Sequence, residues 1–117
     1  MDKAQFEKLT KDYQQLQEQL RNLALQREQF AMQNEEYKEA LASIQASAGK
    51  VYYAVGGALV ESNKDAAAKD IKEKQESLEL RLSIMGKQYE ELSKREQALR
   101  TEITNALKAT GAAGPAQ

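Results

Sequence analysis

The stretch Lys50-Val-Tyr-Tyr-Ala-Val-Gly-Gly-Ala-Leu-Val-Glu-Ser62 decides the fold of this chain. Two short runs of β-branched and aromatic residues flank Gly56-Gly57, and residues of this kind favour strands. Two adjacent glycines supply the positive φ angles that a two-residue hairpin turn requires. The stretch therefore predicts a β-hairpin over residues 50–62. The pairs expected across it are Val55–Ala58, Ala54–Leu59, Tyr53–Val60, Tyr52–Glu61 and Val51–Ser62.

Before the hairpin, residues 1–49 carry a seam whose positions recur at alternating steps of three and four. Its members are Phe6, Leu9, Tyr13, Leu16, Leu20, Leu23, Arg27, Phe30, Asn34, Tyr37, Leu41, Ile44 and Ala48. A heptad seam held over this length is a strong signal for a coiled coil. No Pro or Gly interrupts the run before Gly49. The pattern predicts one long coiled-coil helix over 1–49.

After the hairpin, residues 63–110 repeat the same pattern. The second seam reads Ile71, Gln75, Leu78, Leu82, Met85, Tyr89, Leu92, Glu96, Leu99, Ile103 and Ala106. Asn63 or Ser62 can cap the start of this helix, and Asp65 is favourably placed in its first turn. Gly111, Gly114 and Pro115 end it near Thr110, so residues 111–117 are expected to form a flexible tail.

A short hairpin between two long helices makes them antiparallel neighbours. The expected fold is therefore mainly α with a small β element, a long antiparallel two-helix coiled coil joined by one β-hairpin in a single unit. Arg27 and Glu96 are the charged positions of the two seams. We expect them to share a layer or to occupy adjacent layers, where an Arg–Glu contact would fix the register.

A lone two-stranded hairpin is marginal in water, and this one has two open edges and apolar faces. We therefore expect it to be an oligomerisation element. The residues expected to carry assembly are Val51, Tyr53, Val55, Gly56, Gly57, Leu59 and Val60. Leu80 and Ile84 lie off the second seam and are expected to pack under a neighbouring sheet. The alternative for these two is that they are isolated exposed residues, which are common.

Composition excludes several classes of function. The 117 residues include 17 Lys+Arg and 18 Asp+Glu, so the net charge of −1 argues against nucleic-acid or anionic-membrane partners. The chain has no Cys and no His, which removes thiolate and imidazole chemistry. The neighbouring carboxylates of Glu35-Glu36 and Glu90-Glu91 are expected to lie on solvent-exposed helix faces and not to form a catalytic pair. Gly56-Gly57 lacks the further glycines and the Lys-Ser/Thr of a phosphate-binding loop. We expect no enzyme, no metal and no cofactor, in a soluble cytoplasmic protein.

The hairpin and the start of the second helix resemble a known family. The matching stretches are Val51–Val60 and Lys72–Leu82, and with the heptad helices on both sides they resemble the β-type subunits of prefoldin, most closely those of archaeal type. The resemblance implies a hexamer of two α-type and four β-type subunits, whose hairpins form a double β-barrel. It also implies that the open ends of the coiled coils hold non-native proteins and pass them to a chaperonin without nucleotide. Gln75 and Gly86 depart from the family's pattern.

The antiparallel pairing brings both ends of the chain together, and there the last turns can expose apolar side chains to a client. The candidate client-binding residues are Phe6, Leu9, Ile103 and Leu107. Ordinary coiled-coil core is the alternative for these residues. The rival function for the whole chain is a structural or tethering coiled coil without chaperone activity. Such a tether has no use for the apolar hairpin, which favours the chaperone hypothesis.

Overall fold

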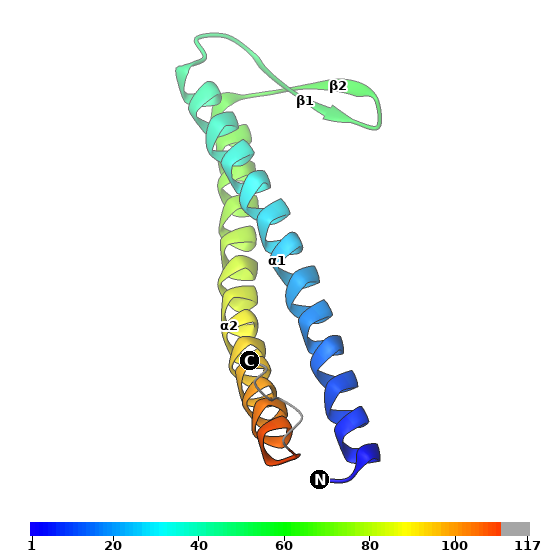
Figure 1. Ribbon diagram of the computed structural model, residues 1–117. Coiled ribbons are helices and arrows are strands. Elements are labelled where there is room, and N and C mark those ends of the chain that lie inside the picture. The colour runs from blue at the N-terminus through cyan, green and yellow to red at the C-terminus, as the bar shows by residue number, and fades with distance from the viewer. Residues whose placement is uncertain (111–117) are drawn as a thin grey trace. The chain divides into compact units, whose positions relative to one another are not determined.

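The computed structural model describes residues 1–110; the predicted tail, 111–117, lies outside the described residues. Helix α1 spans Lys3–Ala46 and helix α2 spans Lys64–Thr110. Strands β1, Val51–Val55, and β2, Ala58–Ser62, lie between them in the chain and form a two-stranded antiparallel sheet (Figure 1). The predicted fold class, two long helices with one hairpin between them, is confirmed.

The hairpin has the predicted register. All five expected pairs are present, from Val55–Ala58 beside the turn to Val51–Ser62 at the open end. Gly56 and Gly57 have φ angles of 55° and 88°. Both values lie in the left-handed region, which costs a residue with a Cβ roughly 1–2 kcal/mol. The two glycines are therefore required by the turn, and the turn sets the register of the strands.

Both helices begin at a capped end. Asn63 Oδ1 accepts a hydrogen bond of 2.7 Å from the main-chain N–H of Ala66, so Asn63 is the cap of α2. At the start of α1, the N–H of Gln5 donates to Asp2 Oδ1 at 2.7 Å and the N–H of Asp2 donates to Gln5 Oε1 at 3.1 Å. This reciprocal capping box was not predicted, although the Asp-x-x-Gln spacing signals it.

The described chain divides into two compact units, and each helix contributes to both. We call residues 1–26 with 85–110 the terminal unit, and residues 27–84 the hairpin unit. In the terminal unit the seam side chains of both helices are buried or half-buried, with Leu16 only 5% exposed. In the hairpin unit the seam positions within the helices are likewise buried or half-buried, with Leu78 buried and the Arg81 guanidinium 5.4 Å from the centre of the Phe30 ring. Ala48, predicted as the last seam position of a helix over 1–49, is exposed, because α1 already ends at Ala46. The predicted heptad seams are the cores of the two units.

The expected layer of Arg27 with Glu96 is wrong. Glu96 accepts its cross-helix hydrogen bond from the Tyr13 hydroxyl, at 2.8 Å. Tyr13 precedes Arg27 by 14 residues on α1, which is about 21 Å of helix. Arg27 lies 29 residues before Gly56, whereas Glu96 lies 39 residues after Gly57, so the two were never equally far from the turn.

Candidate functional surfaces

The hairpin exposes most of its apolar side chains. Tyr52, Tyr53, Val55, Leu59 and Val60 are all exposed, and Leu59 keeps 75% of its surface accessible. Val51 and Ser62, at the open end, are half-buried. An exposed Leu is common, but a whole apolar strand pair without cover is not, because burial of each large side chain is worth about 1.5–3 kcal/mol. All of the predicted assembly residues except Val51 are therefore uncovered, and we call this set the hairpin surface: Tyr53, Val55, Gly56, Gly57, Leu59 and Val60.

Both edges of the hairpin are open. The two-residue turn makes Val55–Ala58 a hydrogen-bonded pair, so the alternate pairs Ala54–Leu59 and Tyr52–Glu61 direct their main-chain groups outward. The Lys50 ammonium lies 3.4 Å from the Glu61 carboxylate. All other residues of the 50–62 segment are uncharged. Since β1 carries no charge and no Pro over Val51–Val55, its edge lacks the features that normally prevent strand addition.

A groove of about 720 Å³ lies in the hairpin unit between the hairpin and the neighbouring helix ends. One side is formed by Val51–Val55, and the other by Ile44, Ala67 and Ile71 among others. Lys74 lies along it and binds Asp70 at 3.0 Å, and the hydrogen bond to that carboxylate raises the pKa of Lys74. The groove is mainly apolar where the hairpin faces the helices, so it extends the hairpin surface.

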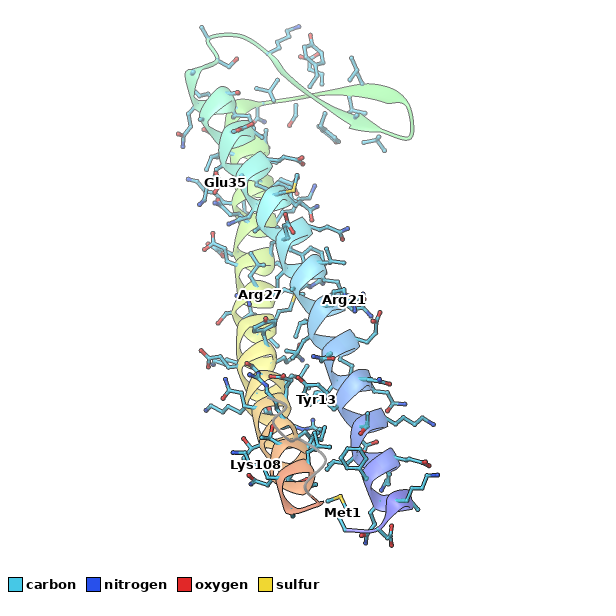
Figure 2. The ribbon with its side chains drawn as sticks, viewed as in Figure 1. Met1, Tyr13, Arg21, Arg27, Glu35 and Lys108 are labelled. Carbon is cyan, nitrogen blue, oxygen red and sulfur yellow. The ribbon has the colours of Figure 1, made fainter. Side chains whose placement is uncertain are left out.

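The start of α1 and the end of α2 lie at the same end of the terminal unit, where Figure 2 shows Met1 and Lys108. The four candidate client-binding residues are all present there and all half-buried: Phe6, Leu9, Ile103 and Leu107. Each thus combines packing within the helix pair with some accessible apolar area. Met1 adds an exposed thioether side chain at this end, which sequence reasoning missed. We call these five residues the tip.

A triad of polar side chains, Tyr13, Glu96 and Arg100, lies at the seam of the terminal unit; Tyr13 and Glu96 are seam positions, and Arg100 lies off the seam. Glu96 is 8% exposed, and its carboxylate accepts hydrogen bonds from Tyr13 at 2.8 Å and from Arg100 at 2.7 Å (Figure 2 shows Tyr13). The Arg100 guanidinium and, second, the Tyr13 hydroxyl hold the pKa of the Glu96 carboxyl below its usual range. The hydrogen bond to Glu96 raises the pKa of Tyr13. The triad fixes the helix register in this unit.

Further apolar side chains are exposed on the outer faces of the helices. Leu80, 64% exposed, and Ile84 lie off the seam of α2, as expected from their positions. Leu25 and Met32 on α1 are also exposed and were missed by the sequence reasoning, although their seven-residue spacing places them on one helical face. Within its own unit the described chain covers none of these four side chains, so the packing of Leu80 and Ile84 under a neighbouring sheet stays a prediction.

Two negative findings apply to residues 1–110. Neither described helix has a segment long and apolar enough to cross a membrane. No cluster of three or more acidic side chains within this range has an arrangement that could hold a metal ion.

Three comparisons with known proteins agree. The family model described as "Prefoldin subunit" matches residues 7–110. The prefoldin subunit beta of Pyrobaculum islandicum is 33% identical over 101 residues, covering 85% of this chain and 81% of the relative. The prefoldin subunit beta of Methanococcoides burtonii is 35% identical over 100 residues, covering 84% of this chain and 86% of the relative.

A solved structure shows the same architecture. The crystal structure of the prefoldin beta subunit from Thermococcus strain KS-1 matches with a TM-score of 0.81 and 30% identity, covering 88% of this chain and 92% of that one. The sequence match, which spans both helices and the hairpin, confirms the resemblance seen in the hairpin and the second helix. The chain belongs to the prefoldin subunit family, and it is similar to the beta subunits of that family.

Proposed function

We propose that this chain, a member of a family of chaperone subunits, is an ATP-independent holdase subunit of the cytoplasm. Its hairpin assembles with α-type subunits and with other copies of itself, in a hexamer of two α-type and four β-type chains. The tips of the assembled coiled coils hold non-native polypeptides and deliver them to a chaperonin.

The uncovered hairpin surface is the observation that carries this proposal. Leu59, Val55 and Tyr52 face solvent in the chain by itself, and both strand edges have unpaired main-chain groups. Pairing and burial against other subunits would satisfy the edges and cover the side chains at once. A tethering coiled coil needs no such element, which is why the assembly function is favoured.

The tip supports the holdase part of the proposal. Its half-buried residues can each contribute only part of the roughly 1.5–3 kcal/mol that full burial of a large side chain provides. One tip would therefore bind a client weakly and without sequence preference. Several tips in one assembly would act together, because linked weak contacts raise the effective concentration at each remaining site.

The test combines Phe6→Ser, Leu9→Ser, Ile103→Ser and Leu107→Ser in the complex assembled with an α-type subunit. We expect the complex to keep its mass, because the end turns of helices contribute little to global stability. Protection of guanidinium-denatured citrate synthase against aggregation, followed by light scattering, should fall sharply. Sedimentation of the same sample establishes that the complex is intact.

A matched pair of variants separates the tip from apolar surface in general. Phe6→Ser with Leu9→Ser changes the tip. Leu25→Ser with Met32→Ser instead removes two apolar side chains from the outer face of the same helix, where both are more exposed than Phe6 and Leu9. We expect only the first pair to lose protection. Equal protection by the quadruple variant and the parent would mean that clients bind elsewhere, and equal loss in both pairs would deny the tip any special role.

A further inference from the structure

The flank of α1 in the terminal unit is made of uncharged amides. From residue 15 onward, the positions that recur at steps of four and three on this side of the seam are Gln15, Gln19, Asn22 and Gln26, and the same spacing continues at Gln29 and Gln33 in the hairpin unit. Flanking positions of a coiled coil are usually charged, because ion pairs there select the partner helix and its orientation. Six successive amides cannot form ion pairs, so this flank is not built for that purpose.

The amides of the terminal unit line a groove between the two helices. One part, of about 450 Å³, is lined by Gln19, Asn22, Gln26 and Gln88, with Leu23 and Leu92 at its base and Glu91 and Arg95 beside them. A second part, of about 510 Å³, is lined by Asp12, Gln15, Leu16, Ala98 and Leu99. The two parts share Gln19 and Arg95, so they form one continuous groove, which we call the amide groove.

The groove has an apolar floor and polar walls. Leu16 is buried and Leu23, Leu92 and Leu99 are half-buried, whereas the amide side chains of Gln19, Asn22, Gln26 and Gln88 are exposed. Along α1 the groove runs from Asp12 to Gln26, which is about 21 Å of helix. That length matches roughly six residues of extended chain at about 3.3 Å each.

We propose that the amide groove binds an extended segment of non-native polypeptide by its main chain. Each amide side chain offers both a donor and an acceptor, and so does each residue of an unpaired main chain. The alternate side chains of an extended segment point to opposite faces, so one set can contact the leucine floor. Such recognition reads no sequence, which suits a holdase.

An extended segment fits better than a helix as the occupant. The main-chain groups of a helix are already hydrogen-bonded along their own axis, so they leave the groove's amides without partners. The main-chain N–H and C=O groups of an unfolded client are unpaired, so they can hydrogen-bond to the amides of the groove. The inference rests on the proposed holdase function, and it adds a second contact area to the tip, which lies in the same unit.

The test compares two triple variants in the complex assembled with an α-type subunit. Gln19→Ala, Gln26→Ala and Gln88→Ala remove amides from the groove, and Gln14→Ala, Gln17→Ala and Gln97→Ala remove the same number of exposed amides elsewhere in the terminal unit. Alanine favours helix in both sets. The probe is fluorescently labelled, reduced and carboxymethylated α-lactalbumin, which stays unfolded, and binding is followed by anisotropy.

We expect the groove variant to bind the probe about tenfold more weakly, as loss of a few hydrogen bonds implies, and the control variant to match the parent. A ten-residue peptide and its main-chain N-methylated analogue sharpen the test. N-methylation should weaken binding to the parent and leave binding to the groove variant nearly unchanged. Equal binding by both triple variants, or an equal effect of N-methylation on parent and groove variant, overturns the inference.

Two further outcomes separate this inference from the proposed function. If the parent fails to bind the unfolded probe at all, the holdase function itself fails. If the parent binds and the tip variant loses binding while the groove variant does not, the function stands and the groove inference falls. A changed mass of the groove variant alone would assign the groove to a contact between copies and would also overturn it.

Discussion

The helix seams and the hairpin use the same kinds of side chain in opposite ways. Leu16, Leu78 and Met85 are buried by the opposing helix within their own units. Leu59 and Val55 on the hairpin are exposed, although they are equally apolar. Because burial stabilises both sets by similar amounts per area, the difference lies in the available partner. The seam finds its partner within the chain, and we propose that the hairpin finds its partner in another chain.

The largest effect is expected from a charge on the hairpin. Leu59→Asp or Val55→Asp should abolish assembly, because a carboxylate would be buried in the interface at a cost of several kcal/mol. The helix content of the chain should stay nearly unchanged. Sedimentation velocity gives the mass and circular dichroism the helix content. Val55 and Leu59 lie on opposite faces of the sheet, so the two variants also show which face is more deeply buried.

Leu25→Asp is the matched control for these hairpin variants. Leu25 is also an exposed Leu, but it lies on the outer face of α1. We expect this variant to assemble like the parent. Assembly that survives Leu59→Asp, or that is lost equally with Leu25→Asp, would remove the contrast between seam and hairpin.

A smaller effect is expected where the seam contains a polar residue. The Oδ1 atom of Asn34 is buried without a hydrogen-bond partner among the described residues. An unsatisfied buried acceptor costs about 1–3 kcal/mol, so Asn34→Leu should raise the free energy of unfolding by about that amount. Urea titration followed by circular dichroism measures it. Gln75→Leu, at another half-buried polar seam position, should raise the free energy of unfolding by less. An equal or larger increase in Gln75→Leu would contradict the explanation by the unsatisfied Asn34 oxygen.

The smallest effect concerns the pH dependence of the terminal unit. The pKa of Glu96 is lowered in the folded chain by Arg100 and then by Tyr13, so the stabilisation from this carboxylate is present above the usual carboxyl pKa. It is lost as the pH falls through the lowered folded pKa. Tyr13→Phe removes one of the two causes, so the loss of stability on acidification should be smaller than in the parent and should be complete at a higher pH.

Thermal melting between pH 2 and 7 measures this effect, and we expect Tyr13→Phe to lower the melting temperature near neutral pH by about 5 °C. In the parent, the hydrogen bond to Glu96 raises the pKa of Tyr13, so its stabilisation is fully present below the ordinary tyrosine pKa and is lost as the pH rises through the raised value. Identical acid profiles for parent and variant would show that the Tyr13–Glu96 hydrogen bond contributes nothing.

Local signals predicted much of this fold. The register of the hairpin follows from Gly56-Gly57, because a two-residue turn leaves one pairing for its strands. The seams follow from the heptad periodicity of apolar residues, which can be read directly from the sequence of each helix. The residue of α1 that lies opposite Glu96 could not be predicted from periodicity, since it depends on how many residues join each helix to its strand. Residues 47–50 precede β1, whereas Asn63 alone precedes α2, so the helices pair with an offset.

The candidate surfaces were predicted unevenly for the same reason. The tip residues Phe6 and Ile103 could be named because they lie at the ends of the periodic seams, and Leu107 could be named because it lies beside the second seam. The amide groove was missed because Gln and Asn off the seam look like ordinary solvated positions. Only the opposing helix, with Gln88 and Leu92, shows that these amides border an apolar floor.

Hydrogen exchange in the assembled complex tests the central claim, that the hairpin is completed by other subunits. The outward-facing N–H groups of Tyr52, Ala54, Leu59 and Glu61 have no partner across the hairpin's own ladder. In the complex with an α-type subunit, we expect the 51–62 segment to exchange slowly, and in Leu59→Asp to exchange at nearly the rate of an unprotected chain. Fast exchange of 51–62 in an intact complex whose helices are protected would contradict the account.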